Sequence, residues 1–189
     1  MVHIYVQCQK THSKTYTEGI RKMIEIRQSD IFEDLDERSI LVHQTNFYGV
    51  MGAGIAVVIK KKFPEVFKRY YELCNSTKDK KSLLGTCQMC KVSDNLYIFN
   101  AFGQNDMSWD ACVTDYKSWH KICKHILETV ARANRLVYGV EWTVHIPYKI
   151  GCGIAGGDVD TMHKIFKKYF EDAPFKVVFH DIGKVINYD

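Results

Sequence analysis

Short β-rich runs and longer amphipathic stretches alternate along this chain. Runs typical of strands occur at residues 2–7, 22–26, 40–44, 86–92, 96–102, 142–146 and 176–180. Apolar residues at three-to-four spacing, which are typical of helices, occupy residues 54–74, 110–134 and 158–172. Pro64 divides the first of these stretches into two predicted helices. This order predicts a three-layer α/β fold with helices on both faces of a sheet.

The spacing of the predicted strands indicates the type of sheet. Parallel neighbours need a crossover of a dozen or more residues, and the early strands have too little chain between them. We therefore expect a mixed sheet. The 189 residues can bury one large core, and no repeat, linker or low-complexity segment divides them. These features predict a single domain over residues 1–189.

Composition limits the expected cellular location of the protein and the classes of partner that it could bind. The formal net charge of +4 favours an acidic ligand weakly, and it is too small for a nucleic-acid footprint, so we expect no sequence-specific nucleic-acid partner. Seven cysteines, an odd number, do not resemble the disulfide framework of a small secreted domain and indicate a reducing cytoplasm. The sequence contains no signal-peptide pattern and no apolar run of about eighteen residues, so we expect no membrane partner.

Two glycine-rich loops each follow a predicted strand and precede a predicted helix. They lie at residues 47–56 and 146–158. Glycine lets backbone N–H groups approach an anion closely, and the helix N-terminus that follows adds its own N–H groups and the positive end of its dipole. Two such loops predict a diphosphate or nucleotide ligand.

Both loops contain fragments of other nucleotide-binding motifs. Gly151-Cys-Gly-Ile-Ala-Gly156 has the glycine spacing of a dinucleotide fingerprint, but it lies late in the chain, whereas that fingerprint belongs to the first strand–helix turn of a long parallel sheet. Gly49 and Gly54 have the outer spacing of a P-loop, but Ile55 stands where the lysine is required. A Rossmann site and a nucleoside triphosphatase are therefore both disfavoured.

The cysteines offer little chemistry of their own. Cys87 and Cys90 have the separation of half a zinc site, but no second pair completes a ligand set, so we expect no metal and no cofactor. Cys152 lies in the second loop, where no neighbour in sequence supplies a base that would activate it. We expect Cys152 to serve in packing.

Four polar residues lie where ligands meet side chains in open α/β sheets. His43 lies at the end of a predicted buried strand and Asn46 follows it, just ahead of the first loop, and Asn46 can both donate to and accept from a sugar hydroxyl. Asp30 could accept from an exocyclic amine, and Asp158 could act on a ligand or on water. The alternatives are a buried structural histidine for His43 and ordinary N-caps for both aspartates.

Taken together, five motifs resemble the macro domain family, in particular its small stand-alone ADP-ribose 1″-phosphate phosphatase-like members in bacteria and phages. They are Asp30-Ile-Phe, Leu41-Val-His-Gln-Thr-Asn46, Gly49-Val-Met-Gly-Ala-Gly-Ile-Ala56, Asn100-Ala-Phe-Gly-Gln104 and Ile146-Pro-Tyr-Lys-Ile-Gly-Cys-Gly-Ile-Ala-Gly-Gly-Asp158. The resemblance covers residues 22–182. It implies a mixed six-stranded sheet between helices, with residues 1–21 as an N-terminal extension that carries the extra first strand.

The resemblance also implies a set of ADP-ribose-binding residues. Asp30 would accept from the adenine amino group beside Ile31, and Asn46 would hold the distal ribose, whose end Phe102 and Gln104 would line. The first loop would close on the diphosphate from one side and the second from the other. These loop residues are Gly52, Ala53, Gly54, Ile55 and Ala56 in the first, and Gly151, Gly153, Ile154, Ala155, Gly156 and Gly157 in the second.

The reaction implied by the resemblance is hydrolysis of the phosphomonoester of ADP-ribose 1″-phosphate. His43 or Asp158 would activate and orient the water, without a metal. One alternative is a non-catalytic module that reads or sequesters ADP-ribose, since it would share the same pocket. Another is an ADP-ribosyl hydrolase acting on modified protein or nucleic acid, which Ala155 disfavours because the branch that releases ADP-ribose from glutamate has an aspartate there. ADP-ribosylated macromolecules are therefore a further class of partner, and the expected location is the cytoplasm, or the host cytoplasm for a phage protein.

Overall fold

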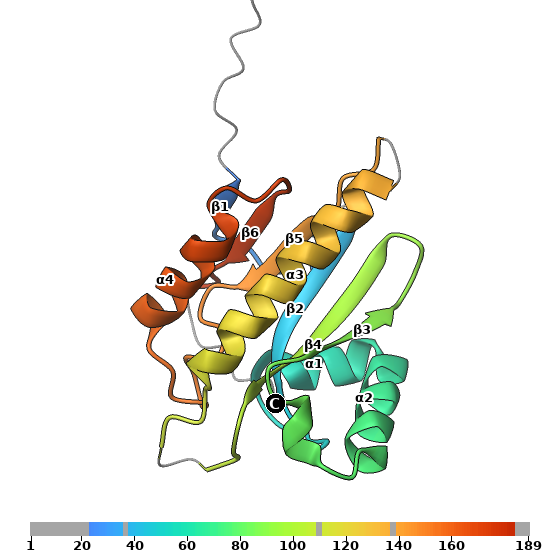
Figure 1. The fold of residues 1–189 in the computed structure, drawn as a ribbon, viewed down its shortest axis with the longest axis vertical. Helices are drawn as coiled ribbons and strands as arrows, with labels where there is room; N and C mark the ends of the chain where they lie inside the picture. The colour runs from blue at the N-terminus through green and yellow to red at the C-terminus, as the bar shows by residue number, and fades with distance from the viewer. Residues whose placement is uncertain (1–22, 36–37, 109–110, 137–138, 184–189) are drawn as a thin grey trace, which may run out of the picture.

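Six strands form one sheet in the order β1-β6-β5-β2-β4-β3 (Figure 1). The computed structural model describes residues 23–35, 38–108, 111–136 and 139–183. The strands are β1 (Ile24–Arg27), β2 (Ser39–Asn46), β3 (Cys87–Lys91), β4 (Leu96–Gln104), β5 (Thr143–Pro147) and β6 (Val177–His180). The strand expected at residues 2–7 and the extension that would carry it lie outside the described residues.

Strand directions confirm the expected mixed sheet, but for a different reason. All neighbouring pairs are parallel except β3 and β4, which form an antiparallel hairpin because the link from Lys91 to Leu96 is short enough for a turn. The early strands β1 and β2 do not pair with each other. Strands β6 and β5 lie between them, so the chain crosses the sheet after β1.

The helices begin and end close to the predicted limits. They are α1 (Gly54–Lys62), α2 (Pro64–Ser76), α3 (Tyr116–Leu136) and α4 (Val159–Phe170), with a 3₁₀ turn η1 at Lys80–Leu83. Pro64 occupies the first turn of α2, where its missing N–H costs nothing. Helix α3 begins later than expected because Asp115 caps it, accepting from the backbone N–H of Ser118 at 2.7 Å.

Two hydrophobic clusters fill the spaces on either side of the sheet. One joins α3 and α4 to the sheet through large side chains such as Trp119 and Phe166, and the other joins α1 and α2 to it through Ile59 and Tyr70. Alternate residues of β2 belong to opposite clusters, as expected of a central strand buried on both faces. Figure 1 shows α3 and α4 lying across the same face of the sheet.

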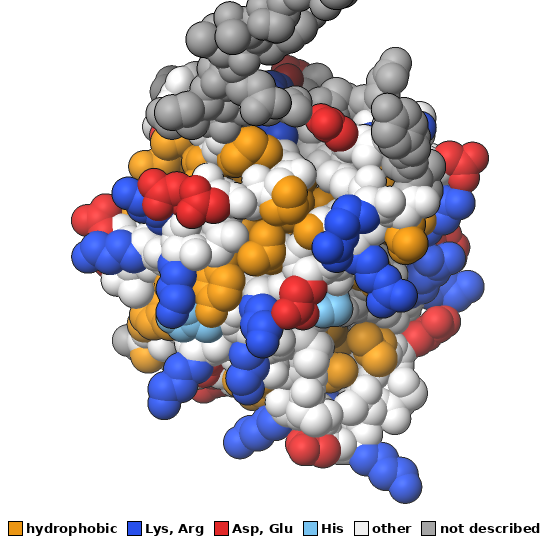
Figure 2. All heavy atoms as spheres, turned by 45° about the horizontal axis from the view of Figure 1, so that its top comes forward, with side chains coloured by type: hydrophobic (Ala, Val, Ile, Leu, Met, Phe, Trp, Pro, Cys, Tyr) orange, Lys and Arg blue, Asp and Glu red, His pale blue; other side chains and the backbone are white. Residues whose placement is uncertain are grey.

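This arrangement brings the two glycine loops to one edge of the sheet. The first loop follows β2 and the second follows β5, and these neighbouring strands are parallel. Their carboxyl ends therefore meet at the same edge, which is where open α/β sheets bind ligands. No helix in the described part of the chain is long and apolar enough to cross a membrane. On the face in Figure 2, basic side chains are interspersed with acidic and hydrophobic ones.

Candidate functional site

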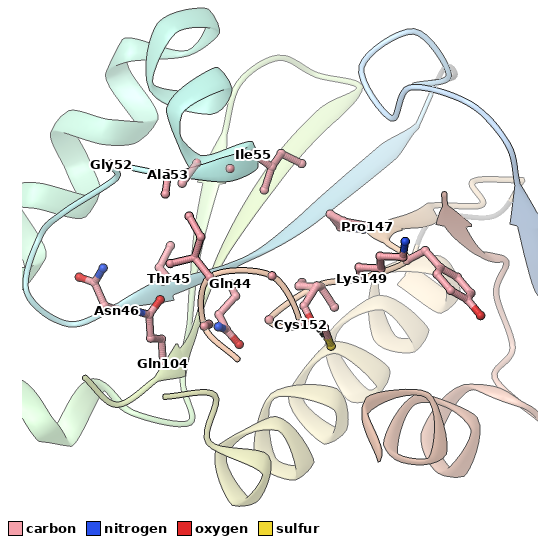
Figure 3. A pocket seen from close by; sticks show the side chains of 18 of the residues that line it. Gln44, Thr45, Asn46, Gly52, Ala53, Ile55, Gln104, Pro147, Lys149 and Cys152 are labelled. Carbon is pink, nitrogen blue, oxygen red and sulfur yellow. Dashed lines mark hydrogen bonds between the residues drawn. The ribbon is translucent and has the colours of Figure 1, made fainter. Parts of the chain in front are cut away.

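A cavity of about 630 Å³ lies at the carboxyl ends of the parallel strands. This volume is in the range of small-molecule sites. Figure 3 shows Gly52, Ala53 and Ile55 of the first loop on one side, facing Lys149 and Cys152 of the second loop region on the other. Side chains from the ends of β2, β4, β5 and β6 complete the lining.

The first loop offers the N-terminus of α1 to this cavity. Helix α1 begins at Gly54, and no described side chain caps it. The N–H groups of Gly54, Ile55 and Ala56 belong to the first helical turn, which has no intrahelical acceptors. All three residues line the cavity. An anion here would receive these hydrogen bonds and the positive end of the helix dipole.

The second loop folds back on itself and divides its N–H groups into two sets. Gly156 donates to the Gly153 carbonyl and Gly157 to the Gly151 carbonyl, each at 2.9 Å. These two residues do not line the cavity, so their expected contact with a diphosphate does not fit their position. By contrast, the N–H groups of Gly153, Ile154 and Ala155 have no protein acceptor within the described residues, and these three do line the cavity.

Gln44 forms part of the floor beneath the second loop. Its Oε1 accepts from the indole Nε1 of Trp119 at 2.7 Å, and its Nε2 donates to the hydroxyl of Thr114 at 3.1 Å. The Thr114 hydroxyl in turn donates to the Gly151 carbonyl at 2.6 Å. A polar network thus joins the end of β2 to the second loop and holds it in one conformation.

Asp30 lies in the turn after β1 and lines the cavity beside Ile31. Its Oδ1 accepts from the backbone N–H of Phe32 at 2.9 Å, and its carbonyl accepts from that of Glu33 at 3.1 Å. The residue therefore forms a local Asx-type turn and not the alternative helix N-cap. Its second carboxylate oxygen remains available to a donor on a ligand.

Asn46 lines the cavity but is already well bonded to the protein. Its Oδ1 accepts from the Tyr48 N–H at 2.9 Å and from the Tyr70 hydroxyl at 2.8 Å, and its Nδ2 donates to the Val50 carbonyl at 2.9 Å. The side chain therefore shapes the loop between β2 and α1. One hydrogen on Nδ2 remains for a ligand.

His43 does not lie in the cavity, and the expected direct activation of a water does not fit its position. The side chain is fully buried, and Nε2 lies 2.6 Å from Oδ1 of Asn100 on the neighbouring strand. Its Nδ1 has no partner among the described residues. Burial lowers the pKa of His43 to about 4, so the ring is neutral near pH 7. This geometry corresponds to the alternative of a structural core histidine.

Asp158 is the N-cap of α4, again matching the structural alternative. Its carboxylate accepts from both the backbone N–H and the hydroxyl of Thr161, at 2.8 and 2.6 Å. These bonds hold the pKa of Asp158 below its usual range. The residue is exposed and does not line the cavity. A direct role in activating water at the cavity therefore does not fit this conformation.

Of the remaining predicted residues, one lines the cavity and one does not. Gln104 lines the cavity, and its Nε2 donates to the Asp106 carbonyl at 2.7 Å. Phe102 is fully buried in the cluster beneath α1 and α2, so it lies behind the lining and not in it. The structure thus brings most of the two loops together with Asp30, Asn46 and Gln104. The predicted residues left outside the lining are Phe102, His43, Asp158, Gly156 and Gly157.

Several lining residues were not predicted from the sequence. His180, Asp181 and Ile182 follow from the rule that ligands meet the carboxyl ends of strands, since β6 ends at His180. Met107 and Ser108 had no comparable signal in the sequence. Cys152 lines the cavity as well, but burial, reinforced by Asp158 and Cys112, raises its pKa to about 11. Its thiol therefore stays protonated near pH 7 and is a poor nucleophile.

Comparisons with known proteins agree with this geometry. A family model described as the Macro domain matches residues 42–166. An ADP-ribose 1″-phosphate phosphatase from Meyerozyma guilliermondii is 37% identical over 76 residues, which are 40% of this chain and 42% of that protein. A Candida albicans protein of the same name is 27% identical over 139 residues, covering 64% of this chain and 87% of that protein. The chain thus spans less than half of the first relative and most of the second.

Solved structures show the same fold. A macrodomain protein from Streptomyces coelicolor superimposes with a TM-score of 0.68 at 18% identity, covering 84% of this chain and 98% of that one. Thermosipho africanus DarTG, solved in complex with ADP-ribose, has a TM-score of 0.66 at 18% identity and covers 86% of this chain and 43% of that one. The family match includes strands β3, β4 and β5 and the two loops that precede α1 and α4. The chain therefore belongs to the macro domain family.

Proposed function

We propose that the cavity binds ADP-ribose and that the protein hydrolyses the phosphomonoester of ADP-ribose 1″-phosphate. The observation that carries the proposal is the pair of facing loops. The N–H groups of Gly54 and Ile55 on one side and of Gly153 and Ile154 on the other are free of protein acceptors among the described residues, so they suit a diphosphate held between them.

The two ends of the cavity suit the two ends of ADP-ribose. Asp30 and Ile31 would contact adenine, whose amino group can donate to the free carboxylate oxygen of Asp30. Asn46 and Gln104 lie together at the far end, where strand β2 pairs with β4, and would contact the distal ribose. Figure 3 shows these two side chains close to each other, away from Lys149.

Relatives support the phosphatase activity. Both curated relatives are named as ADP-ribose 1″-phosphate phosphatases. In the proposed reaction, water attacks phosphorus, the bond between phosphorus and the ribose oxygen breaks, and inorganic phosphate leaves. We do not assign the proton transfer to His43 or Asp158, because neither lines the cavity.

The absence of His43 and Asp158 from the cavity lining favours a second candidate function. A module that binds ADP-ribose without turnover needs the cavity but no water-activating group. An ADP-ribosyl hydrolase finds less support, since Ala155 lines the cavity with a methyl group where that mechanism would have a carboxylate. The phosphatase and the binding module differ in turnover and not in affinity for ADP-ribose.

The test measures both properties with purified protein. Calorimetric titration would give the affinity for ADP-ribose, and phosphate release from ADP-ribose 1″-phosphate would give turnover. Asp30→Ala should weaken binding, whereas Asp160→Ala, an exposed acid in the first turn of α4, should not. Tight binding with phosphate release supports the phosphatase, and tight binding without release supports the binding module. Absence of binding would overturn both.

A further inference from the structure

A chain of buried polar side chains crosses half of the sheet and ends at the turn that carries Asp30. The Ser39 hydroxyl on β2 lies 3.3 Å from Nε2 of His145 on β5. Nδ1 of His145 lies 2.9 Å from Nε2 of His180 on β6. Nδ1 of His180 then lies 3.1 Å from the hydroxyl of Ser29, the residue just before Asp30. Each link in this chain is within hydrogen-bond distance.

The two histidines of this chain are buried, and the direction of its hydrogen bonds follows from the protonation of His180. His145 is fully buried and His180 is 4% exposed. Burial and the neighbouring His145 lower the pKa of His180 to about 4. Each neutral imidazole carries one N–H, so a donor at one end of the chain orders the protons of all the others. Because the Ser29 hydroxyl donates to Asp34, Nδ1 of the neutral His180 donates to Ser29, and Nε2 of His180 accepts from Nδ1 of His145.

The turn is also anchored from its other side. The Ser29 hydroxyl lies 3.3 Å from Oδ2 of Asp34, which accepts from Nη1 of Arg27 at 2.6 Å. Nε of Arg27 donates to Glu25 at 2.6 Å, and Glu25 forms an ion pair with Lys176 at 2.7 Å. The hydrogen bond from Arg27 holds the pKa of Asp34 below its usual range. Ser29 is therefore the point where the buried chain and the more exposed ion pairs meet.

Asp30 depends on this anchoring because its own segment has little regular structure. The residues from Gln28 to Leu35 form bends and turns, without helix or strand. The local bond from the Phe32 N–H sets the rotamer of Asp30, but it cannot set the position of the turn relative to the sheet. The Ser29–His180 contact ties the turn to β6, alongside the Arg27–Asp34 pair and the buried side chain of Ile31, and both His180 and Asp30 line the cavity.

We propose that Ser29 and His180 are positioning residues for recognition of the adenine end: their hydrogen bond holds the turn so that the Asp30 carboxylate faces the exocyclic amine of the base. The inference rests on the proposed function, because it assumes that the cavity binds ADP-ribose. It adds two residues that control selectivity for the base, although neither contacts the exocyclic amine.

Two ligands that differ only at the base can be used to measure the selectivity for the exocyclic amine. Inosine diphosphate ribose differs from ADP-ribose in carrying a carbonyl oxygen in place of the amino group. The wild-type protein should prefer ADP-ribose, and Asp30→Ala should abolish the preference. Ser29→Ala removes one hydroxyl from a half-buried position and should reduce the ratio of the two dissociation constants by about fivefold, the value of one hydrogen bond. His180→Phe keeps a flat ring and should act in the same direction.

A matched control separates positioning from a general loss of stability. Ser82→Ala likewise removes one serine hydroxyl, which here donates to the backbone carbonyl of Asp79, and Ser82 lies on η1 away from the cavity lining. It should leave the ratio unchanged. A variant that only destabilised the protein would weaken both ligands equally and keep the ratio.

The outcomes distinguish the two levels of the proposal. If the wild-type protein binds neither ligand, the proposed function fails and the inference fails with it. If the wild-type protein prefers ADP-ribose but Ser29→Ala and His180→Phe keep the full preference, the proposed function stands and the positioning role is overturned. A reduced preference in both variants, with Ser82→Ala unchanged, supports the inference.

Discussion

The Thr114 hydroxyl donates a 2.6 Å hydrogen bond to the carbonyl of Gly151, joining the segment before α3 to the second loop. Gly151 has φ = 71°, a left-handed conformation that other residues rarely adopt. A Cβ at this position would lie 2.6 Å from Oε1 of Gln44 and 2.9 Å from the Thr114 hydroxyl. The tight network at the floor of the cavity therefore requires glycine at residue 151.

The first prediction concerns this glycine. Gly151→Ala should destabilise the protein and displace the second loop, because the added methyl group meets two polar atoms and the backbone is strained. Thermal unfolding and ADP-ribose titration would measure both effects. Gly153→Ala is the matched control, since its Cβ would meet nothing within 4 Å. Equal melting temperatures for the two variants would contradict the prediction.

Tyr70 should stabilise the first loop through Asn46. Its buried hydroxyl donates to the carbonyl or to Oδ1 of Asn46, each at 2.8 Å. Tyr70→Phe should lower the free energy of unfolding by about 1 kcal/mol and weaken ligand binding, because it removes one buried hydrogen bond that holds a cavity-lining side chain. Urea unfolding would measure the loss. Tyr71→Phe, at a position 52% exposed, should change neither property.

His43 should matter for stability more than for chemistry. His43→Ala should lower the free energy of unfolding by about 2 kcal/mol or more, since it opens a cavity in the core and leaves Oδ1 of Asn100 without its histidine partner. Phosphate release per folded molecule should remain measurable. Stability would be followed by urea unfolding. A variant with wild-type stability and affinity but no turnover would return His43 to the reaction.

Asp158 offers a comparable test at the helix end. Asp158→Ala should lower the melting temperature because the first turn of α4 loses its N-cap, while Asp158→Ser should keep most of the stability because serine also caps well. Turnover should follow the folded fraction in both variants. If Asp158→Ser were fully folded, bound ADP-ribose normally and lost turnover, the carboxylate would have a chemical role.

Stability should fall as the pH drops below the ordinary histidine range. The pKa of His43 and that of His180 are each lowered to about 4 in the folded protein, mainly by burial. Between about pH 6.5 and pH 4 the unfolded chain therefore binds more protons than the folded one. Each histidine contributes up to about 1.4 kcal/mol of lost stability per pH unit in that window.

Acidic residues extend this loss to lower pH. The hydrogen bond from Arg27 lowers the pKa of Glu25 to about 2, so the stability contributed by Glu25 is present above its ordinary pKa and disappears as the pH falls toward 2. Urea unfolding at a series of pH values would test both parts. A free energy of unfolding that stays constant from about pH 7 to pH 4.5 would contradict the histidine assignment.

Local patterns in the sequence were sufficient to predict most of the helices and strands. The spacing of apolar residues located α2 and α4, and Pro64 marked the boundary between α1 and α2. The two glycine loops could also be recognised, because an anion cradle is built from consecutive backbone groups. Such features depend on neighbours in the chain, so they can be read from it directly.

The extent of the lining could be predicted only in part. Asp30 and the two loops were identified by motifs, but His180 was missed because it reaches the cavity through the pairing of β6 with β1 and β5. Met107 and Ser108 join it from the segment after β4. The end of the predicted strand at residues 176–180 could have pointed to His180, whereas Met107 and Ser108 have no signature within their own stretch of sequence.

The sequence by itself determined the α/β alternation, the two anion-binding loops and the family resemblance, since each is carried by residues close together in the chain. Tertiary structure decided the strand order, the burial of His43 behind the cavity and the His145–His180 contact. These depend on which strands become neighbours and on which face of the sheet a side chain lies. Such relationships join residues far apart in sequence, and free energies of packing set them when the whole sheet assembles.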